Sequence, residues 1–234
     1  MVAKKTTKKE ATNRVSATNG AQPKVGGLIT VPSLNLAVIG VRLVGTTGLL
    51  TNSIKQTGPD LGNKYSGAGP SGKAKAAPKS LEEMYLDAMY VLADSKHAPP
   101  SPKASYGIPT SGILKCIKTA IRLTGINDNT TVGKIQKSIQ VRGKEQCGHL
   151  SRIKFKELVK DNRPAAVKGV PSPRCRPMFN GWTCDLDVTY NPLIMEPKGL
   201  LNLILHAGFY VGLCEMRAEK GQGECGGFTA QLTG

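Results

Sequence analysis

Histidines are the residues of this sequence best suited to acid-base chemistry near neutral pH. There are three, His97, His149 and His206, and a histidine can serve as the general base of a metal-independent nuclease. His206 falls in an apolar segment that we interpret as a buried helix, so a packed or capping role is favoured over catalysis. His97 and His149 fall in loop-like segments, and no Tyr or Lys lies at a spacing that indicates a catalytic pair. The histidines therefore do not predict an active site.

Asp185 and Asp187 in "DLD" are paired carboxylates, the residue type that holds the ions of a two-metal nuclease. Residues two apart on a strand point to the same face. The surrounding "GWTCDLDVTYNP" alternates strictly, so a solvated strand face is the favoured interpretation. No C-x-x-C pair or Cys/His cluster at zinc-finger spacing occurs. We therefore expect no metal and no other cofactor, and we expect that the chain is not an enzyme.

The six cysteines are predicted to be reduced thiols in a cytoplasmic protein. The N-terminus has lysines but lacks the apolar region of a secretory signal, which disfavours a disulfide framework. The longest apolar stretches fall short of the roughly 20 residues that cross a bilayer, so no membrane association is expected. "GAGPSGKAK" lacks the spacing and the strand-to-helix context of a phosphate-binding loop, and no small-molecule substrate is predicted.

The charge of the chain indicates its class of partner. The sequence holds 32 Lys and Arg against 16 Asp and Glu, a formal charge of +16, which is typical of proteins that bind polyanions such as nucleic acid. An ordinary solvated surface is the alternative for each basic residue taken alone. Seven basic residues in three segments are the candidate phosphate contacts: Lys115, Lys118, Arg122, Arg174, Arg176, Arg217 and Lys220.

Aromatic residues make up only 5% of the sequence. Many proteins that bind single strands stack bases on aromatic side chains, and a platform of that kind would be thin here. We therefore expect contacts that follow the phosphate backbone, with little sequence preference and a steep dependence on salt.

Composition divides the chain into an arm and a single domain. Residues 1–26 are rich in lysine and poor in apolar residues, which predicts a disordered basic arm. Residues 27–234 are expected to form one domain, with a flexible Gly-, Pro-, Ser- and Lys-rich insertion at about 55–80. The arm has two interpretations, attraction to phosphate and a solubilising tail.

Periodicity and capping residues predict the elements of this domain. We expect a strand at 35–44, a helix from Ser80, a second helix with Thr110 or Ser111 as its N-cap, and a strand at 182–190. In the C-terminal third we expect a helix from Pro197 that Gly208 ends, and a strand at 209–217 followed by a glycine-rich hairpin loop. Residues 126–170 leave two alternatives open, because "KIQKSIQVRG" suits a strand with a basic face or a short amphipathic helix.

These elements predict an α+β fold. Strand, helix and strand follow one another in the C-terminal third, and such a unit places both strands in one sheet. A similar unit that begins with the strand at 35–44 would complete a ferredoxin-like, modified RNA-recognition-like core.

Three blocks of the sequence resemble the RAMP superfamily, the repeat-associated proteins of CRISPR systems. They are "VIGVRLVGTTGLLTNSI", "YGIPTSGILKCIKTA" and the glycine-rich "AGFYVGLCEMRAEKGQGECGGF". A closer likeness is to uncharacterised bacteriophage proteins that share these blocks and a segment like "PRCRPMFNGWTCDLDVTYNP". Gly48 stands where the superfamily usually has Pro, and the loop lacks its full repeated-glycine pattern. The resemblance implies the same fold and binding of single-stranded nucleic acid, without implying cleavage.

Three hypotheses of function follow. The leading one is a phage-type, RAMP-like protein of the host cytoplasm that binds single-stranded RNA or DNA without catalysis. As in the CRISPR backbone subunits that it resembles, copies of the chain would then associate into a filament or ring. The second is a viral structural or assembly protein whose basic arm neutralises the packaged genome. The third is a metal-independent endoribonuclease.

Overall fold

The computed structural model describes residues 33–53, 80–167, 170–172, 174–221 and 223–233. The chain divides into two units, Met1–Leu34 and Asn35–Gly234, and the second contains all the elements described below. The predicted arm at 1–26 and the predicted insertion at 55–80, apart from Ser80, lie outside the described residues.

The protein is a mixture of helices and antiparallel sheets, as expected for the α+β class. The largest sheet has four strands, β1 (Ala37–Gly45), β4 (Ile139–Gly143), β11 (Thr183–Tyr190) and β12 (Phe228–Thr233). Their order in the sheet is β12-β1-β11-β4, and every neighbouring pair is antiparallel. The strands predicted at 35–44 and 182–190 are confirmed as β1 and β11.

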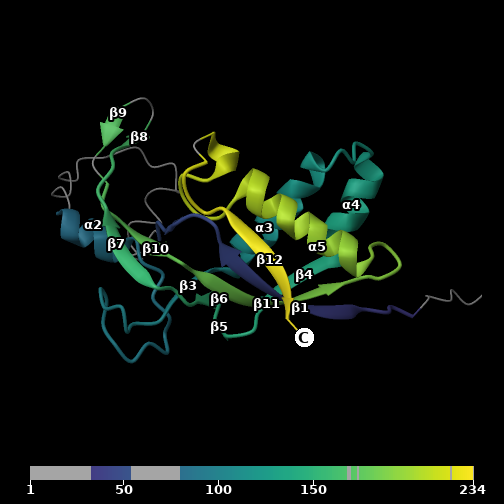
Figure 1. The fold of residues 1–234 in the computed structure, drawn as a ribbon, viewed down its shortest axis with the longest axis horizontal. Coiled ribbons are helices and arrows are strands. Elements are labelled where there is room, and N and C mark those ends of the chain that lie inside the picture. Colours follow the sequence, from purple (N-terminus) through teal and green to yellow (C-terminus); the bar gives the residue numbers. More distant parts are fainter. Residues whose placement is uncertain (1–32, 54–79, 168–169, 173, 222, 234) are drawn as a thin grey trace, which may run out of the picture. The chain divides into compact units, whose positions relative to one another are not determined.

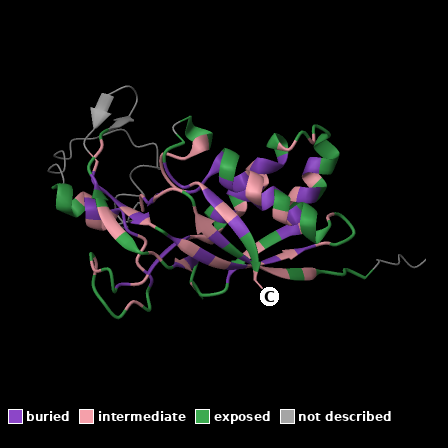
Figure 2. Cartoon of the chain, in the orientation of Figure 1, coloured by how far each residue is buried: buried purple, intermediate pink, exposed green. Residues whose placement is uncertain are grey.

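Alternation along β11 sets the two faces of this sheet. Cys184, Leu186, Val188 and Tyr190 are buried, while the residues between them are only half-buried. The buried face lies beneath the helices α3 (Thr110–Ala120) and α5 (Pro197–His206) (Figure 1). Buried residues gather between these helices and the sheet (Figure 2), so the core lies between the two layers.

Residues 126–170, where the sequence left two alternatives open, contain one helix and then short strands. Helix α4 (Asn129–Ser138) is capped by Asp128, whose carboxylate accepts hydrogen bonds from the backbone N–H groups of Thr130 and Thr131 at 3.3 and 2.7 Å. "KIQKSIQVRG" is divided, because the helix ends at Ser138 and β4 begins at the next residue. Three further strands follow, β5 (Gln146–Cys147), β6 (Leu150–Ile153) and β7 (Glu157–Asp161).

Smaller sheets occupy the other end of the domain. The order β2-β10-β7 joins β2 (Leu49–Leu50) and β10 (Arg176–Asn180) to β7, and the order β3-β6-β5 contains β3 (Tyr106–Pro109). The strands β8 (Ala165–Val167) and β9 (Val170–Ser172) pair only with each other among the described residues. Tyr106, Phe155 and Phe179 pack ring to ring at centroid distances of 5.0–5.8 Å.

Helix α2 (Leu81–Asp87) begins where the sequence predicts. The Ser80 hydroxyl accepts a hydrogen bond from the Glu83 backbone at 3.2 Å, and the Glu83 carboxylate accepts one from the Ser80 backbone at 2.7 Å, which forms a capping box. The helix ends at Asp87, and Val91, four residues later, forms a β-bridge with Tyr106. No helix among the described residues is long and apolar enough to span a membrane.

The strand predicted at 209–217 is wrong. α5 continues into a π-helical turn, η2 (Ala207–Val211), and the chain leaves it at Gly212 with φ 73°. The reason is packing: Leu200, Ile204, Ala207 and Val211 are all buried and continue a helical spacing along one face. The single strand in this region is β12, which pairs with β1.

Gly208 therefore does not end the helix. A Cβ atom at this position would lie 1.9 Å from the carbonyl oxygen of Phe228. Glycine is needed here because the π-helical turn approaches β12 too closely for any side chain.

Candidate nucleic-acid interface

Helix α3 presents three of the predicted basic residues on one face. Ile113, Cys116, Ile117 and Ala120 are buried against the core, which leaves the opposite face to solvent. That face carries Lys115, Lys118 and Arg122, the last of them on the 3₁₀ turn η1 (Ile121–Leu123) that continues the helix. Thr110 and Ser111 were predicted as N-cap residues, but Pro109 occupies that position and makes no side-chain cap. The Thr110 hydroxyl instead lies 2.7 Å from that of Ser151.

The three cations line one open groove of about 420 Å³, which we call the α3 groove. It runs between α3 and Gln136 of α4. Its lining residues are Ser111, Leu114, Lys115, Lys118, Thr119, Arg122 and Gln136. The groove thus has three positive side chains and no acidic one.

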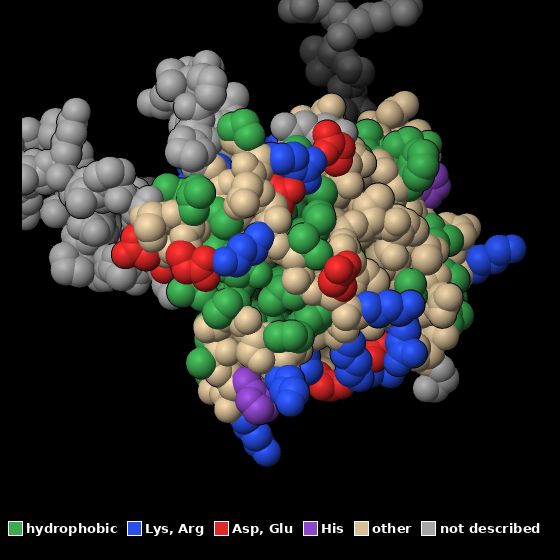
Figure 3. All heavy atoms as spheres, turned by 60° about the vertical axis from the view of Figure 1, so that its left-hand side comes forward, with side chains coloured by type: hydrophobic (Ala, Val, Ile, Leu, Met, Phe, Trp, Pro, Cys, Tyr) green, Lys and Arg blue, Asp and Glu red, His purple; other side chains and the backbone are tan. Residues whose placement is uncertain are grey.

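None of the three cations forms an ion pair within the part of the chain that the structure describes. Elsewhere pairing is common: Arg42 with Asp185, Arg152 with Glu145, and Lys154 with Glu145. Figure 3 shows a face on which acidic side chains lie beside lysine or arginine side chains at several places. The α3 groove therefore brings together three cations that have no carboxylate partner among the described residues.

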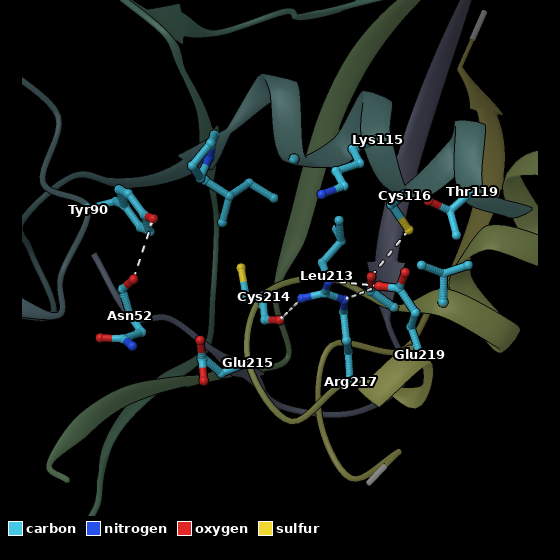
Figure 4. A pocket seen from close by; sticks show the side chains of 15 residues that line it. Asn52, Tyr90, Lys115, Cys116, Thr119, Leu213, Cys214, Glu215, Arg217 and Glu219 are labelled. Carbon is cyan, nitrogen blue, oxygen red and sulfur yellow. Dashed lines mark hydrogen bonds and ion pairs between the residues drawn. The ribbon is translucent and has the colours of Figure 1, made fainter. Parts of the chain in front are cut away.

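A second hollow, of about 270 Å³, adjoins the groove, and Lys115 and Thr119 line both. We call it the side pocket (Figure 4). One side is formed by α3, another by Asn52 and Tyr90, and the floor by the turn at residues 211–219. Its apolar lining residues are Ile108, Pro109, Val211 and Leu213.

Residues from the three sequence blocks at 38–54, 106–120 and 207–228 meet at the side pocket. Asn52 comes from the first segment, Ile108 and Lys115 from the second, and Leu213 and Arg217 from the glycine-rich third. The first and third segments also hydrogen bond to each other, since the Gly226 N–H donates to the Gly48 carbonyl at 2.8 Å.

Charges in the side pocket balance, unlike those in the groove. Arg217 donates to the Glu219 carboxylate at 2.7 and 3.0 Å, and to the Cys214 carbonyl at 2.7 Å. Lys115 and Glu215 lie on opposite sides of the hollow (Figure 4), and the Glu215 carboxylate pairs with the buried Arg176 at 3.6 Å. The lining contains two cations and two carboxylates, so its formal charge is zero.

The two thiols of the side pocket, those of Cys116 and Cys214, are poor nucleophiles. The Cys116 Sγ donates to the Gly212 carbonyl at 3.2 Å, and burial raises the pKa of this thiol to about 12. Desolvation also raises the pKa of Cys214 to about 12. Both thiols are therefore protonated near neutral pH, and a protonated thiol does not attack.

The histidines lie outside both hollows. His206 is half-buried at the end of α5, where it stacks on Tyr210 with ring centroids 5.6 Å apart and an interplanar angle of 13°. His97 and His149 are exposed. Neither the groove nor the side pocket is lined by a histidine of the described chain.

Arg176 is not a phosphate contact, contrary to the prediction. It is buried, with 3% of its side chain exposed, and its guanidinium lies 3.5 Å from the carboxylate of the buried Asp161. The error arises because the partner of Arg176 lies on another strand. Arg176 is on β10, and Asp161 lies opposite it on β7, so Arg176 belongs to an internal ion pair that sequence spacing does not indicate.

The remaining predicted contacts lie apart from the groove. Arg217 joins Lys115 in the side pocket. Lys220 is exposed on η3 (Ala218–Lys220), and Arg174 is half-buried before β10. Lys220 and Arg174 line neither hollow. The structure thus brings together four of the seven predicted residues, Lys115, Lys118, Arg122 and Arg217.

Asp185 and Asp187 lie on the sheet face opposite the helices, as the alternation predicts. Asp185 accepts from Arg42 on β1 at 2.6 and 3.0 Å, and the hydrogen bond to Arg42 lowers the pKa of this carboxyl. Among the described residues no group of three or more His, Cys, Asp or Glu could hold a metal ion. These carboxylates are thus engaged with neighbouring cations.

The Arg42–Asp185 pair makes stability depend on pH. Because the pKa of Asp185 is lower in the folded protein than in the unfolded chain, where it is about 3.9, the pair stabilises the fold fully above that unfolded pKa. The stabilisation is lost as the pH falls through the folded pKa. We expect Asp185→Asn to lower the free energy of unfolding by about 0.5–1 kcal/mol at pH 7. In urea unfolding, this difference should shrink below about pH 4. The control is Asp187→Asn, because Asp187 lies 4.0 Å from Lys144 in a longer ion pair. A difference in unfolding free energy between wild type and Asp185→Asn that stayed constant at acid pH would contradict the expectation.

Two groups near the site were missed by the sequence analysis. Tyr90 and Asn52 reach the side pocket from segments far from α3 in the chain, and no sequence signal joins them. Phe209 and Tyr210 are 75% and 47% exposed on η2, although the sequence suggested a strand there. A helical spacing continued past His206 would have indicated these two residues as exposed.

No model of a known protein family matches this chain, and no curated protein matches it. The function is accordingly argued from the residues of the chain itself.

Proposed function

We propose that this protein binds single-stranded nucleic acid, RNA or DNA, through the α3 groove and without catalysis. The observation that carries the proposal is the set of three cations, Lys115, Lys118 and Arg122, along one open groove that contains no carboxylate. Phosphates bind to lysine and arginine with little regard to sequence. The groove offers such contacts at successive turns of one helix.

The spacing of the cations suits a strand that runs along the helix. Lys115 and Lys118 are three residues apart, and Arg122 follows four residues later, so the three lie on one face. An α-helix rises about 1.5 Å per residue, and the seven-residue span covers roughly 10 Å. This length suits two or three consecutive phosphates of a single strand.

The opposite face of the sheet is a weaker candidate. In RNA-recognition proteins the open sheet face stacks bases on aromatic side chains. Here the outward residues of β11 are Thr183, Asp185, Asp187 and Thr189, and Asp185 is engaged by Arg42. The central strand of this face has no aromatic ring, so the face offers no surface on which bases can stack, and its two carboxylates already pair with Arg42 and Lys144.

We further propose that the four-stranded sheet and its two helices form a ferredoxin-like core and that the chain is RAMP-like. The strand order β12-β1-β11-β4 supports this, with α3 between β1 and β4 in the chain and α5 between β11 and β12. The meeting of the three RAMP-like segments at one hollow is a second support. A phage origin and assembly of copies into a filament or ring belong to the same proposal.

The test is the affinity of the full chain for a fluorescently labelled single-stranded oligonucleotide, measured by anisotropy at salt concentrations from about 50 to about 300 mM. For single strands the logarithm of the association constant falls by about 0.7 per neutralised phosphate for each unit of log salt. Three contacts predict a slope of about −2 or steeper. A slope near zero would contradict the proposal, because binding would not then depend on phosphate contacts.

A further inference from the structure

We propose that the side pocket receives one nucleobase of the bound strand, turned away from its neighbours, while the flanking phosphates rest in the α3 groove. This inference rests on the proposed function. It adds a specific contact to a surface that would otherwise follow only the phosphate backbone.

The first argument is the difference in charge between the two adjoining hollows. The groove has three cations and no carboxylate, which suits phosphate. The side pocket has Lys115 and Arg217 against Glu215 and Glu219, with Arg217 bound to Glu219. A neutral lining with carboxylates disfavours a phosphate and suits an uncharged group that can hydrogen bond.

The second argument is the continuity of the hollows. Lys115 and Thr119 are separated by one helical turn on α3 and line both. A strand whose phosphate contacts Lys115 in the groove therefore has its attached base at the entrance of the side pocket. One strand can therefore occupy both hollows at the same time.

The third argument is the size and lining of the side pocket. Its volume of about 270 Å³ lies just below the roughly 300–1,000 Å³ of sites for drug-sized ligands, so it suits a group no larger than a base. Tyr90 and Leu213 provide surfaces on which a flat ring can pack (Figure 4). Asn52, Thr119 and Glu215 offer hydrogen bonds to the edge of such a ring.

The fourth argument is that the floor of the side pocket is held rigidly in an uncommon conformation. Cys214 and Met216 have φ of 63° and 52°, in the left-handed region that residues other than glycine rarely adopt. Backbone hydrogen bonds fix the turn: Leu213 donates to Gly226 at 2.9 Å, and Glu215 donates to Leu50 at 2.9 Å. A preformed floor lowers the cost of ordering on binding.

A test fills the side pocket without disturbing the fold. Gly112 lines the pocket on α3, and a Cβ atom there would meet nothing closer than 3.9 Å. We expect Gly112→Leu to fold normally, because leucine is a better helix former than glycine, and to place its side chain in the pocket. Gly133→Leu is the matched control, since Gly133 lies in α4 with no atom within 4 Å of its Cβ position.

The measurement compares two labelled strands of equal length, one of deoxyadenosine nucleotides and one of abasic deoxyribose phosphate units. We expect wild type to bind the strand with bases about tenfold more tightly. Gly112→Leu should remove this preference and leave the affinity for the abasic strand within about twofold of the wild-type value. Gly133→Leu should retain the preference.

Three results would overturn the inference. The first is equal binding of both strands by wild type, which leaves the proposed function intact. The second is a preference that survives Gly112→Leu but is lost in Phe209→Ala, because the exposed rings of η2 would then stack the bases. The third is an absence of binding to either strand, which would overturn the proposed function together with the pocket.

Discussion

Replacing Lys115, Lys118 and Arg122 together by glutamine is expected to weaken binding of a single-stranded oligonucleotide about 100-fold at about 0.1 M salt. Each cation is proposed to bind one phosphate, and an interaction of this kind contributes about 1 kcal/mol. Removing all three therefore reduces the binding free energy by about 3 kcal/mol, and each 1.4 kcal/mol is about tenfold in affinity. Glutamine keeps a good helix propensity, so circular dichroism and the unfolding midpoint should not change.

The control for this variant removes the same charge elsewhere. Lys96, Lys103 and Lys198 are exposed outside the α3 groove and form no ion pair with any described residue. Replacing these three by glutamine also lowers the formal charge from +16 to +13, since three positive charges are removed. We expect the affinity to fall by less than about threefold, the effect of net charge alone. Equal decreases in the two triple variants would show that the groove is not the site.

The second large effect concerns the buried charges around Arg176. We expect Asp161→Ala to lower the free energy of unfolding by about 3 kcal/mol, because it removes the buried one of the two carboxylates that pair with the Arg176 guanidinium. The other, Glu215, lies 3.6 Å from the guanidinium and its side chain is 44% exposed. Asp161 also accepts from Arg163 at 2.6 Å, so the substitution removes a partner of two arginines. Urea unfolding should show a lower midpoint with an unchanged slope.

Glu224→Gln is the matched control for the same network. Glu224 also pairs with Arg163, but its side chain is 55% exposed, and exposed pairs contribute little. We expect a change below about 0.5 kcal/mol. A decrease below about 1 kcal/mol for Asp161→Ala would mean that Arg176 finds another partner or water, and that the network does not stabilise the domain as described.

The sequence correctly predicted those strands and helices that each carry a strong local pattern. β11 follows from strict alternation, α2 from Ser80 and the acids after it, and α3 from apolar spacing. The end of α5 could not be predicted in this way. "GFYVGLC" has the composition of a strand, and only the packing of Ala207 and Val211 against α3 makes it helical.

The candidate site was predicted in part. Lys115, Lys118 and Arg122 follow from the polar face of one helix, which local spacing shows directly. The prediction that Arg176 contacts phosphate was wrong, because the burial of Arg176 depends on Asp161, which lies on a different strand. The side pocket could not be found from the sequence, since Tyr90, Thr119 and Glu215 meet only when the chain folds.

The salt dependence of binding, compared between wild type and the Lys115/Lys118/Arg122 glutamine variant, tests the central claim most directly. Each phosphate interaction that the variant removes should reduce the steepness of log affinity against log salt by about 0.7 for a single strand. We therefore predict that the slope of the triple variant is shallower by about 2. Identical slopes in the two proteins would contradict the assignment of the α3 groove as the phosphate-binding surface.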